Sequence, residues 1–344
     1  MAGEAKLRQS NFELLRILAI IMVVMEHFIR QSGLLESGAG PYAAINAFLG
    51  SGARIAVNIF ILVGAWFMVD SDFRPGKAIK LYLETAFYCV PITLLMAMLG
   101  MAGGARNIIQ GMLPFFGRPV WFATAYISLM ILTPFLNKAF MMPSKAQNRL
   151  VGALFVLVCV ASTIPSFSNI DYIADLSWFC VVYLGVGWAK RNDLFSKLVA
   201  GKWLALAAGA LVYAGLCLAE QTPLLAWPAN YWLDNIRTLP NIACALCIFV
   251  FFLKTDMGHI KLVNFLSRSI FAVYIVHQVP AFREFLWKTI CRADTISTLS
   301  PTLYALSVIG VAVAILISVT AVDLLRIKLF AAVETRICKK GCSN

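Results

Sequence analysis

The first apolar segment of the chain carries two side chains whose types and spacing suit chemistry, Arg16 and His27, within the run FELLRILAIIMVVMEHF. At 100° per residue, eleven helical residues bring the two to within about 20° of one face, about 16 Å apart along the axis. Glu13 lies three residues before Arg16 and is expected to pair with it. Glu26 points about 100° away from His27 and is a less obvious partner for it.

Such a face can present a cation and an imidazole to one cavity. The arginine would hold an anionic group, and the imidazole would act as a general base or as a transient acyl acceptor. Ionisable residues within a membrane span cost about 2.5–3.5 kcal/mol each, so they usually face a cavity. The spacing is equally consistent with a structural interpretation, in which Arg16 snorkels at a helix end and His27 hydrogen-bonds a neighbouring helix.

The composition indicates that lipid surrounds the elements that must position these residues. Of the 344 residues, 60% are hydrophobic and 13% are charged, against about 45–50% and about 25% in soluble domains. Apolar runs reach about twenty residues, the length that crosses about 30 Å of hydrocarbon. We therefore predict an all-α, polytopic transmembrane helical bundle with about ten spans. The expected spans are residues 13–30, 45–69, 78–101, 120–142, 149–165, 172–189, 203–220, 239–253, 263–280 and 301–325.

The net charge of +12 favours cytosolic loops over nucleic-acid binding, because the basic residues sit in the short gaps between apolar runs. A cytosolic N-terminus puts most of the 29 Lys and Arg residues on the cytosolic side. Both termini are therefore predicted to be cytosolic, with short tails at about 1–11 and 327–344. Without a repeat or a linker, residues 1–344 form one integral domain, expected to be a multi-pass plasma membrane protein. The nine cysteines lack metal-site spacing, and no metal site is expected.

With Glu13, Arg16 and His27, the first span resembles the membrane-bound acyltransferase-3 family, whose members O-acylate cell-surface and secreted carbohydrates. That family has a basic residue, ten intervening residues and a histidine in its first helix, usually with an acid three residues before the basic one. The second span, ARIAVNIFILVGAWFM, is similar to the corresponding family stretch, with Asn58 at the polar position. Val63 stands where a serine is common in the family.

The resemblance continues in the order that the family shows. FRPGKAIKLY resembles its basic cytosolic segment, with Arg74 and Lys80 at the matching positions. VWFATAYISLMILTPFL is similar to its Trp- and Tyr-bearing span, and LSRSIFAVYIVHQ to its Tyr-x-x-His helix. The match covers residues 12 to about 280, and the last span matches only in hydrophobicity. The residues that the resemblance marks as supporting the site are Glu13, Asn58, Trp121, Tyr126, Tyr274 and His277.

The resemblance implies acetyl-CoA as a cytosolic acyl donor and no permanently bound cofactor. The phosphates of CoA would suit Arg16, together with Arg74, Lys77 and Lys80 after the second span. The last three are equally well explained as ordinary cytosolic anchors. His277 lies three residues after Tyr274 on the same helix face, and a histidine in such a helix is more often structural than catalytic.

The sequence as a whole is interpreted as a membrane O-acetyltransferase that modifies a polysaccharide or other carbohydrate of the cell envelope. Its expected partners are an acyl-CoA donor, a glycan acceptor and the lipid bilayer, without nucleic acid. His27 is the catalytic residue in this interpretation, either as base or as carrier of the acyl group. One alternative is a transporter or flippase of lipid-linked sugars, which needs a path but no chemistry. Another is a binding or assembly protein in which His27 is structural.

Overall fold

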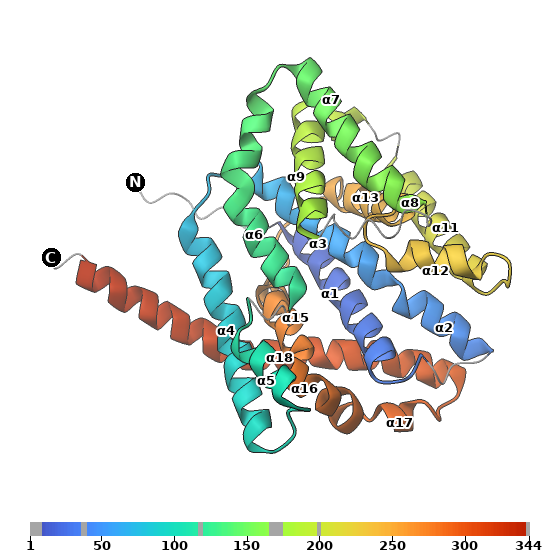
Figure 1. The fold of residues 1–344 in the computed structure, drawn as a ribbon, viewed down its shortest axis with the longest axis vertical. Coiled ribbons are helices and arrows are strands. Elements are labelled where there is room, and N and C mark those ends of the chain that lie inside the picture. Colours follow the sequence, from blue (N-terminus) through green and yellow to red (C-terminus); the bar gives the residue numbers. More distant parts are fainter. Residues whose placement is uncertain (1–8, 36–39, 116–119, 165–174, 198–200, 342–344) are drawn as a thin grey trace.

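A computed structural model describes residues 9–35, 40–115, 120–164, 175–197 and 201–341, and every regular element within them is a helix (Figure 1). The all-α prediction is confirmed for that part of the chain. The longer helices are α1 (Ser10–Gln31), α2 (Pro41–Gly50), α3 (Gly52–Met68), α4 (Pro75–Met98), α6 (Trp121–Leu136), α7 (Ser144–Leu154), α9 (Asp175–Arg191), α11 (Lys202–Glu220), α13 (Leu239–Leu253) and α18 (Pro301–Gly341). The shorter elements are α5 (Ala105–Met112), η1 (Asn137–Met141), η2 (Phe155–Val160), α8 (Ala161–Thr163), α10 (Leu194–Lys197), α12 (Ala226–Asp234), α14 (Lys261–Leu266), η4 (Ser267–Ser269), α15 (Ile270–Gln278), α16 (Pro280–Glu284), η5 (Phe285–Ile290) and α17 (Ala293–Ile296).

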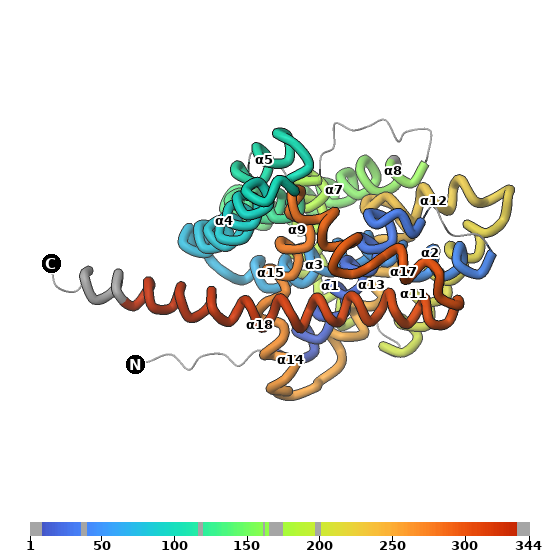
Figure 2. The backbone as a smooth tube through the Cα atoms, turned by 90° about the horizontal axis from the view of Figure 1, so that it is seen from below, coloured from blue at the N-terminus to red at the C-terminus, as the bar shows by residue number. Residues whose placement is uncertain are grey.

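Helix α1 lies inside the bundle and packs against α3, α13, α15 and α18. Its apolar side chains, among them Leu15, Ile20, Val24 and Phe28, are almost completely buried. Figure 2 shows α18 running as one long helix across the width of the molecule, with α1 among the other helices beside it. The helix that bears Arg16 and His27 is therefore surrounded by protein on several sides.

Four helical segments are long and apolar enough to cross a membrane in the described part of the chain. Two further pairs of helices meet the same criterion together but are sharply bent, which gives up to six crossings by length and composition. The four segments are Pro41–Met68, Pro75–Met98, Lys202–Glu220 and Pro301–Thr335. On α11, the leucines at 204, 211 and 218 are strongly exposed and recur every seven residues, as expected for a helix face in contact with lipid.

Each of the two bends lies beside a residue that was predicted to support the site, His277 at the first bend and Asn58 at the second. Helices Lys261–Gln278 and Pro280–Ile290 meet at 80°, because Pro280 lacks an amide hydrogen and disfavours helical geometry at the preceding residue. This break places His277 in the last turn of α15. Helices α12 and α13 meet at 53° across residues 235–238.

The break between α12 and α13 is held by buried amides. Asn58 on α3 donates its Nδ2 hydrogen to the Ile236 carbonyl over 2.8 Å and accepts from the indole of Trp178, also over 2.8 Å. Asn241 donates to the Asn235 carbonyl over 2.8 Å. Asn58, which occupies the polar position of the second predicted span, therefore stabilises a turn that is distant from it in the sequence.

Candidate active site

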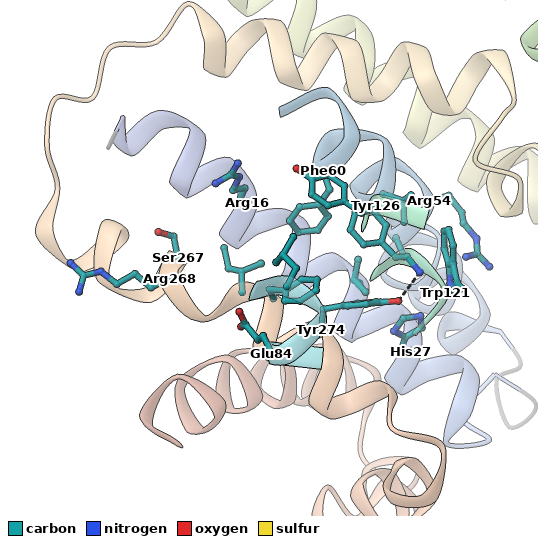
Figure 3. A pocket seen from close by; sticks show the side chains of 17 residues that line it. Arg16, His27, Arg54, Phe60, Glu84, Trp121, Tyr126, Ser267, Arg268 and Tyr274 are labelled. Atoms are coloured by element: carbon teal, nitrogen blue, oxygen red, sulfur yellow. Dashed lines mark hydrogen bonds between the residues drawn. The ribbon is translucent and has the colours of Figure 1, made fainter. Parts of the chain in front are cut away.

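A cavity of about 280 Å³ lies beside α1 and contains both ends of the face predicted from the sequence (Figure 3). Arg16 and His27 line it, and other walls come from α3, α4, α6, η4 and α15. Its polar and aromatic lining residues are Arg16, His27, Arg54, Phe60, Glu84, Trp121, Phe122, Tyr126, Ser267, Arg268, Phe271 and Tyr274. In the close view, Arg16, Ser267 and Arg268 lie toward one end, and His27, Arg54 and Trp121 toward the other.

His27 is held by a hydrogen-bonded chain that determines which of its nitrogens carries a hydrogen. Its Nδ1 atom lies 2.9 Å from Nε2 of His277, whose own Nδ1 lies 2.5 Å from the Val273 carbonyl oxygen. A carbonyl oxygen only accepts, so His277 donates from Nδ1, and its Nε2 is then an acceptor in the neutral ring. His27 therefore donates from Nδ1, which leaves a lone pair on its own Nε2.

That lone pair is the atom a general base or nucleophile needs. Among the described residues, none makes an aligned hydrogen bond with Nε2 of His27, although Oε2 of Glu26 lies 3.2 Å away. The carboxylate thus lies beside the nitrogen without a hydrogen bond to it. It is placed to stabilise a positive charge that develops on the ring.

Glu26 is the residue that the helix geometry had made a less obvious partner. Its Cα–Cβ bond points away from that of His27, but three rotatable bonds let the carboxylate of a glutamate reach a neighbouring side chain. Two arginines hold it there, since Glu26 Oε1 lies 3.2 Å from Nε of Arg30 and 3.7 Å from a terminal nitrogen of Arg54. Its side chain is 3% exposed. The spacing of Glu26 and Arg30, four apart on α1, is a sequence signal from which part of this cluster could have been predicted.

Arg16 lies at the opposite end of the cavity with its carboxylate partner. The Glu13 and Arg16 side chains approach to 3.5 Å, as their spacing predicts. Arg268, from η4 near the start of α15, is an exposed second cation at this end. The sequence interpretation gave it no role, because only the fold brings η4 against α1.

Aromatic rings form the middle of the cavity wall. Phe122 stacks on Tyr126 with ring centroids 5.8 Å apart, and meets Tyr274 edge-on at 5.6 Å and Phe60 edge-on at 5.8 Å. The Tyr274 hydroxyl accepts a hydrogen bond from the Phe122 amide over 3.1 Å, drawn as the dashed line in Figure 3. Gly64 makes room for this arrangement, because a Cβ atom there would lie 2.6 Å from the Tyr126 hydroxyl.

Of the six predicted supporting residues, Glu13 pairs with Arg16, and the other five divide into two groups. Trp121, Tyr126 and Tyr274 line the cavity, whereas His277 lies behind His27 and Asn58 fastens the turn between α12 and α13. The basic residues Arg74, Lys77 and Lys80 lie at the exposed beginning of α4 and are not part of the cavity lining. Lys80 pairs with Glu334 over 2.8 Å. The same helix nevertheless contributes Leu81 and Glu84 to the cavity wall.

Comparison with protein families gives one match. A family model described as an acyltransferase domain, of the acyltransferase-3 type, matches residues 9–321. The match covers α1 to α17 and more than half of α18, so that every residue of the cavity falls within it. No curated protein and no solved structure matches the chain.

Proposed function

Because the chain belongs to the membrane-bound acyltransferase-3 family, we propose that it transfers an acetyl group from cytosolic acetyl-CoA to a hydroxyl of a cell-surface or secreted carbohydrate. The observation that carries the proposal is the hydrogen-bonded chain from the Val273 carbonyl through His277 to Nδ1 of His27, which assigns the lone pair to Nε2 of His27 in a cavity whose other end holds Arg16. A base or nucleophile suits attack on a thioester carbonyl, and a cation suits the phosphates of CoA.

Two routes remain open for the chemical step, and the same residues serve both. In the first, Nε2 of His27 takes the proton of the acceptor hydroxyl while the hydroxyl oxygen attacks the thioester carbonyl. The proton then passes to the departing CoA thiolate. In the second, Nε2 itself attacks the thioester carbonyl, the C–S bond breaks and CoA leaves as its thiolate. The acceptor oxygen then displaces the imidazole from the acetyl group, and the imidazole takes the hydroxyl proton and passes it to the CoA thiolate. The ring becomes positively charged in either route. Glu26 would stabilise that charge, and His277 would hold the ring orientation.

The donor phosphates would contact Arg16 and Arg268 at the end of the cavity away from His27. The exposed basic residues at the start of α4, Arg74, Lys77 and Lys80, would extend this positive surface beyond the cavity. CoA carries several phosphate charges at the end remote from its thioester, so a binding region of this length is expected.

In the proposed orientation both termini are cytosolic and the chain crosses the plasma membrane about ten times, of which up to six are helices or bent pairs that meet the length and composition criterion in the described part of the chain. The orientation rests on the distribution of Lys and Arg, and it puts Arg16 near the cytosol and His27 toward the outer half. In this arrangement the donor and the acceptor reach the same cavity from opposite faces.

The direct test is transfer of labelled acetyl from acetyl-CoA in inverted membrane vesicles that contain the native chain or none. Label on a glycan, dependent on the chain, is the expected result. An uptake of lipid-linked sugar that proceeds without any consumption of acetyl-CoA would instead support a transporter.

Replacing Arg16 with alanine is expected to raise the KM for acetyl-CoA about tenfold, because a charge-assisted hydrogen bond contributes about 1.5–3 kcal/mol. Initial rates against acetyl-CoA concentration measure this, at matched membrane levels. Arg149→Ala, an exposed arginine on α7 outside the cavity, is the matched control and should leave KM unchanged. An unaltered KM in Arg16→Ala would remove this residue from the donor site.

Replacing His277 with leucine is expected to lower kcat about hundredfold without changing the KM for acetyl-CoA, because His27 loses the acceptor that fixes its tautomer and ring orientation. His277→Gln restores a hydrogen-bond acceptor and should recover part of the rate. A loss that His277→Gln repeats in full, with an equal drop in folded protein, would assign His277 to stability alone.

A further inference from the structure

A second cavity of about 660 Å³ adjoins the first and is more open to the surroundings. It is built on α12 and on the break that follows this helix, and its walls include Trp227, Asn230, Tyr231 and Asn235. Arg54 and Trp121 line both cavities. The two spaces therefore share a wall at the end where His27 lies.

The chemistry of this second cavity differs from that of the first. Trp121, Trp227 and Tyr231 offer aromatic surface, while the side-chain amide of Asn230 offers donors and an acceptor together. The amide of Asn235 is held in place, since it donates to the Tyr231 hydroxyl over 3.1 Å and accepts from the Arg237 backbone amide over 3.0 Å. A pyranose ring has the complementary pattern, because its C–H bonds form an apolar face that stacks on aromatic rings and its hydroxyls both donate and accept. Sites for small molecules commonly combine apolar and aromatic walls with a few placed polar groups in this way.

The charges around the second cavity indicate a neutral ring. Arg54 and Arg237 are balanced in formal charge by Asp175 and Asp234. Asp234 is also ion-paired with Arg30, and Arg54 with Glu26. A strongly anionic ligand such as a polyphosphate would find no excess of positive charge here. The same ion pairs connect the wall of this cavity with the carboxylate beside His27.

The polar edge of the cavity is rigid. Residues 235–238 form the break between α12 and α13, and the buried amides of Asn58 and Asn241 hold the carbonyls of Ile236 and Asn235. Tyr231 donates its hydroxyl hydrogen to the Ser162 carbonyl over 2.7 Å. Groups fixed before the ligand arrives lose little conformational entropy on binding, which favours selective recognition.

We propose that this second cavity binds the acceptor as a neutral hexopyranoside, stacked on Trp227 or Trp121 with a hydroxyl directed across the shared wall toward Nε2 of His27. The proposal rests on the proposed acetyl transfer and adds the place and the chemical class of the acceptor. It competes with a plainer role for Trp227, whose side chain is 68% exposed, as one of the tryptophans that anchor a helix at a membrane interface.

The test uses the purified full chain in lipid vesicles with labelled acetyl-CoA and octyl glycosides as probes. The neutral probes are octyl β-D-glucoside, β-D-galactoside and N-acetyl-β-D-glucosaminide. Octyl β-D-glucuronide is the anionic probe, and 1-octanol supplies a hydroxyl without a ring. Transfer to at least one neutral glycoside is expected, with a KM about tenfold below those of the glucuronide and octanol.

The variants Trp227→Ala and Asn230→Ala are each expected to raise the KM for the accepted glycoside about fivefold, with the KM for acetyl-CoA unchanged. Such variants lose contacts that bind the acceptor equally in the ground state and in the transition state. The value of kcat should therefore hardly change. Trp203→Ala is the matched control. This tryptophan is 67% exposed, lies at the beginning of α11, which is the end remote from α12 in the sequence, and is outside both cavities. It should leave both constants unchanged.

The outcomes separate the two proposals. Native protein that consumes no acetyl-CoA with any probe or with water contradicts the proposed function. Native protein that consumes acetyl-CoA, yet prefers octanol or the glucuronide or transfers to no neutral glycoside, overturns the inferred acceptor class. An unchanged glycoside KM in the Trp227→Ala, Asn230→Ala double variant overturns the location.

Discussion

Replacement of His27 with alanine is expected to lower acetyl transfer by about 10³-fold or more, while the chain still inserts and folds. A positioned general base alone contributes about 10²–10⁴-fold, and a nucleophile that carries the acyl group would be lost outright. Removing the ring also leaves the carboxylate of Glu26 without the charge that it would stabilise. Labelled acetyl transfer from acetyl-CoA, at membrane levels equal to those of the native chain, measures the effect.

His259→Ala is the matched control for this experiment. His259 is exposed in the segment between α13 and α14, where its ring is hydrogen-bonded to Asn264, and it does not line either cavity. Its removal should leave the rate within about twofold of native. A His27→Ala chain that acetylates at the full rate would refute both routes at once. Acetyl label trapped on the native chain but not on His27→Ala would select the carrier route.

Replacement of Arg326 with leucine is expected to lower the free energy of unfolding by about 3–5 kcal/mol, the usual cost of leaving a buried charge unpaired. Arg326 is 4% exposed and lies 3.2 Å from Glu84 on α4 and 3.0 Å from Asp323 on its own helix. Tyr88 also donates its hydroxyl hydrogen to Asp323. Without the guanidinium, two carboxylates would remain together in an apolar interior. Thermal unfolding of the purified chain in detergent measures the change.

A surface ion pair between the same two helices gives the comparison. Lys80 and Glu334 are about half exposed, and Lys80→Leu should cost at most about 1 kcal/mol. Adding Asp323→Leu to Arg326→Leu should restore part of the stability, because apolar replacement of a buried pair is often close to neutral. Equal stability of native and Arg326→Leu protein would show that the cluster is hydrated in solution.

Helix positions were largely predictable, because each depends on a local run of apolar residues. The expected span 239–253 coincides with α13, and 203–220 differs from α11 by one residue. The helices α5, α12 and α17 were not expected, since short segments with mixed polarity give no strong periodic signal. At the other extreme, α18 continues through the predicted cytosolic tail as far as Gly341.

The site was predictable only where one helix contains it. The shared face of Arg16 and His27 follows from the period of α1, and Glu13 follows from its spacing. Pairs of residues that lie far apart in the sequence could not be predicted. From the sequence, Arg326 is one more cytosolic cation, and only the fold shows that α4 brings Glu84 beside it. In the same way His277 is expected to be structural, and only the fold shows that it hydrogen-bonds His27.

The aromatic rings in the middle of the first cavity have a consequence for the energetics of the cell. An aqueous passage open to both faces of the membrane would let protons run down their gradient, each carrying about 2.3 kcal/mol for every 100 mV. Phe60, Phe122, Tyr126 and Tyr274 pack together between the ends marked by Arg16 and His27, so the arm of a bound CoA seated along these rings would fill the space that water would otherwise take. In the proposed exchange of an acyl group between two compartments, the bound donor and these rings together would act as electrical insulation. The transfer can then draw on the thioester alone, without dissipating the membrane potential.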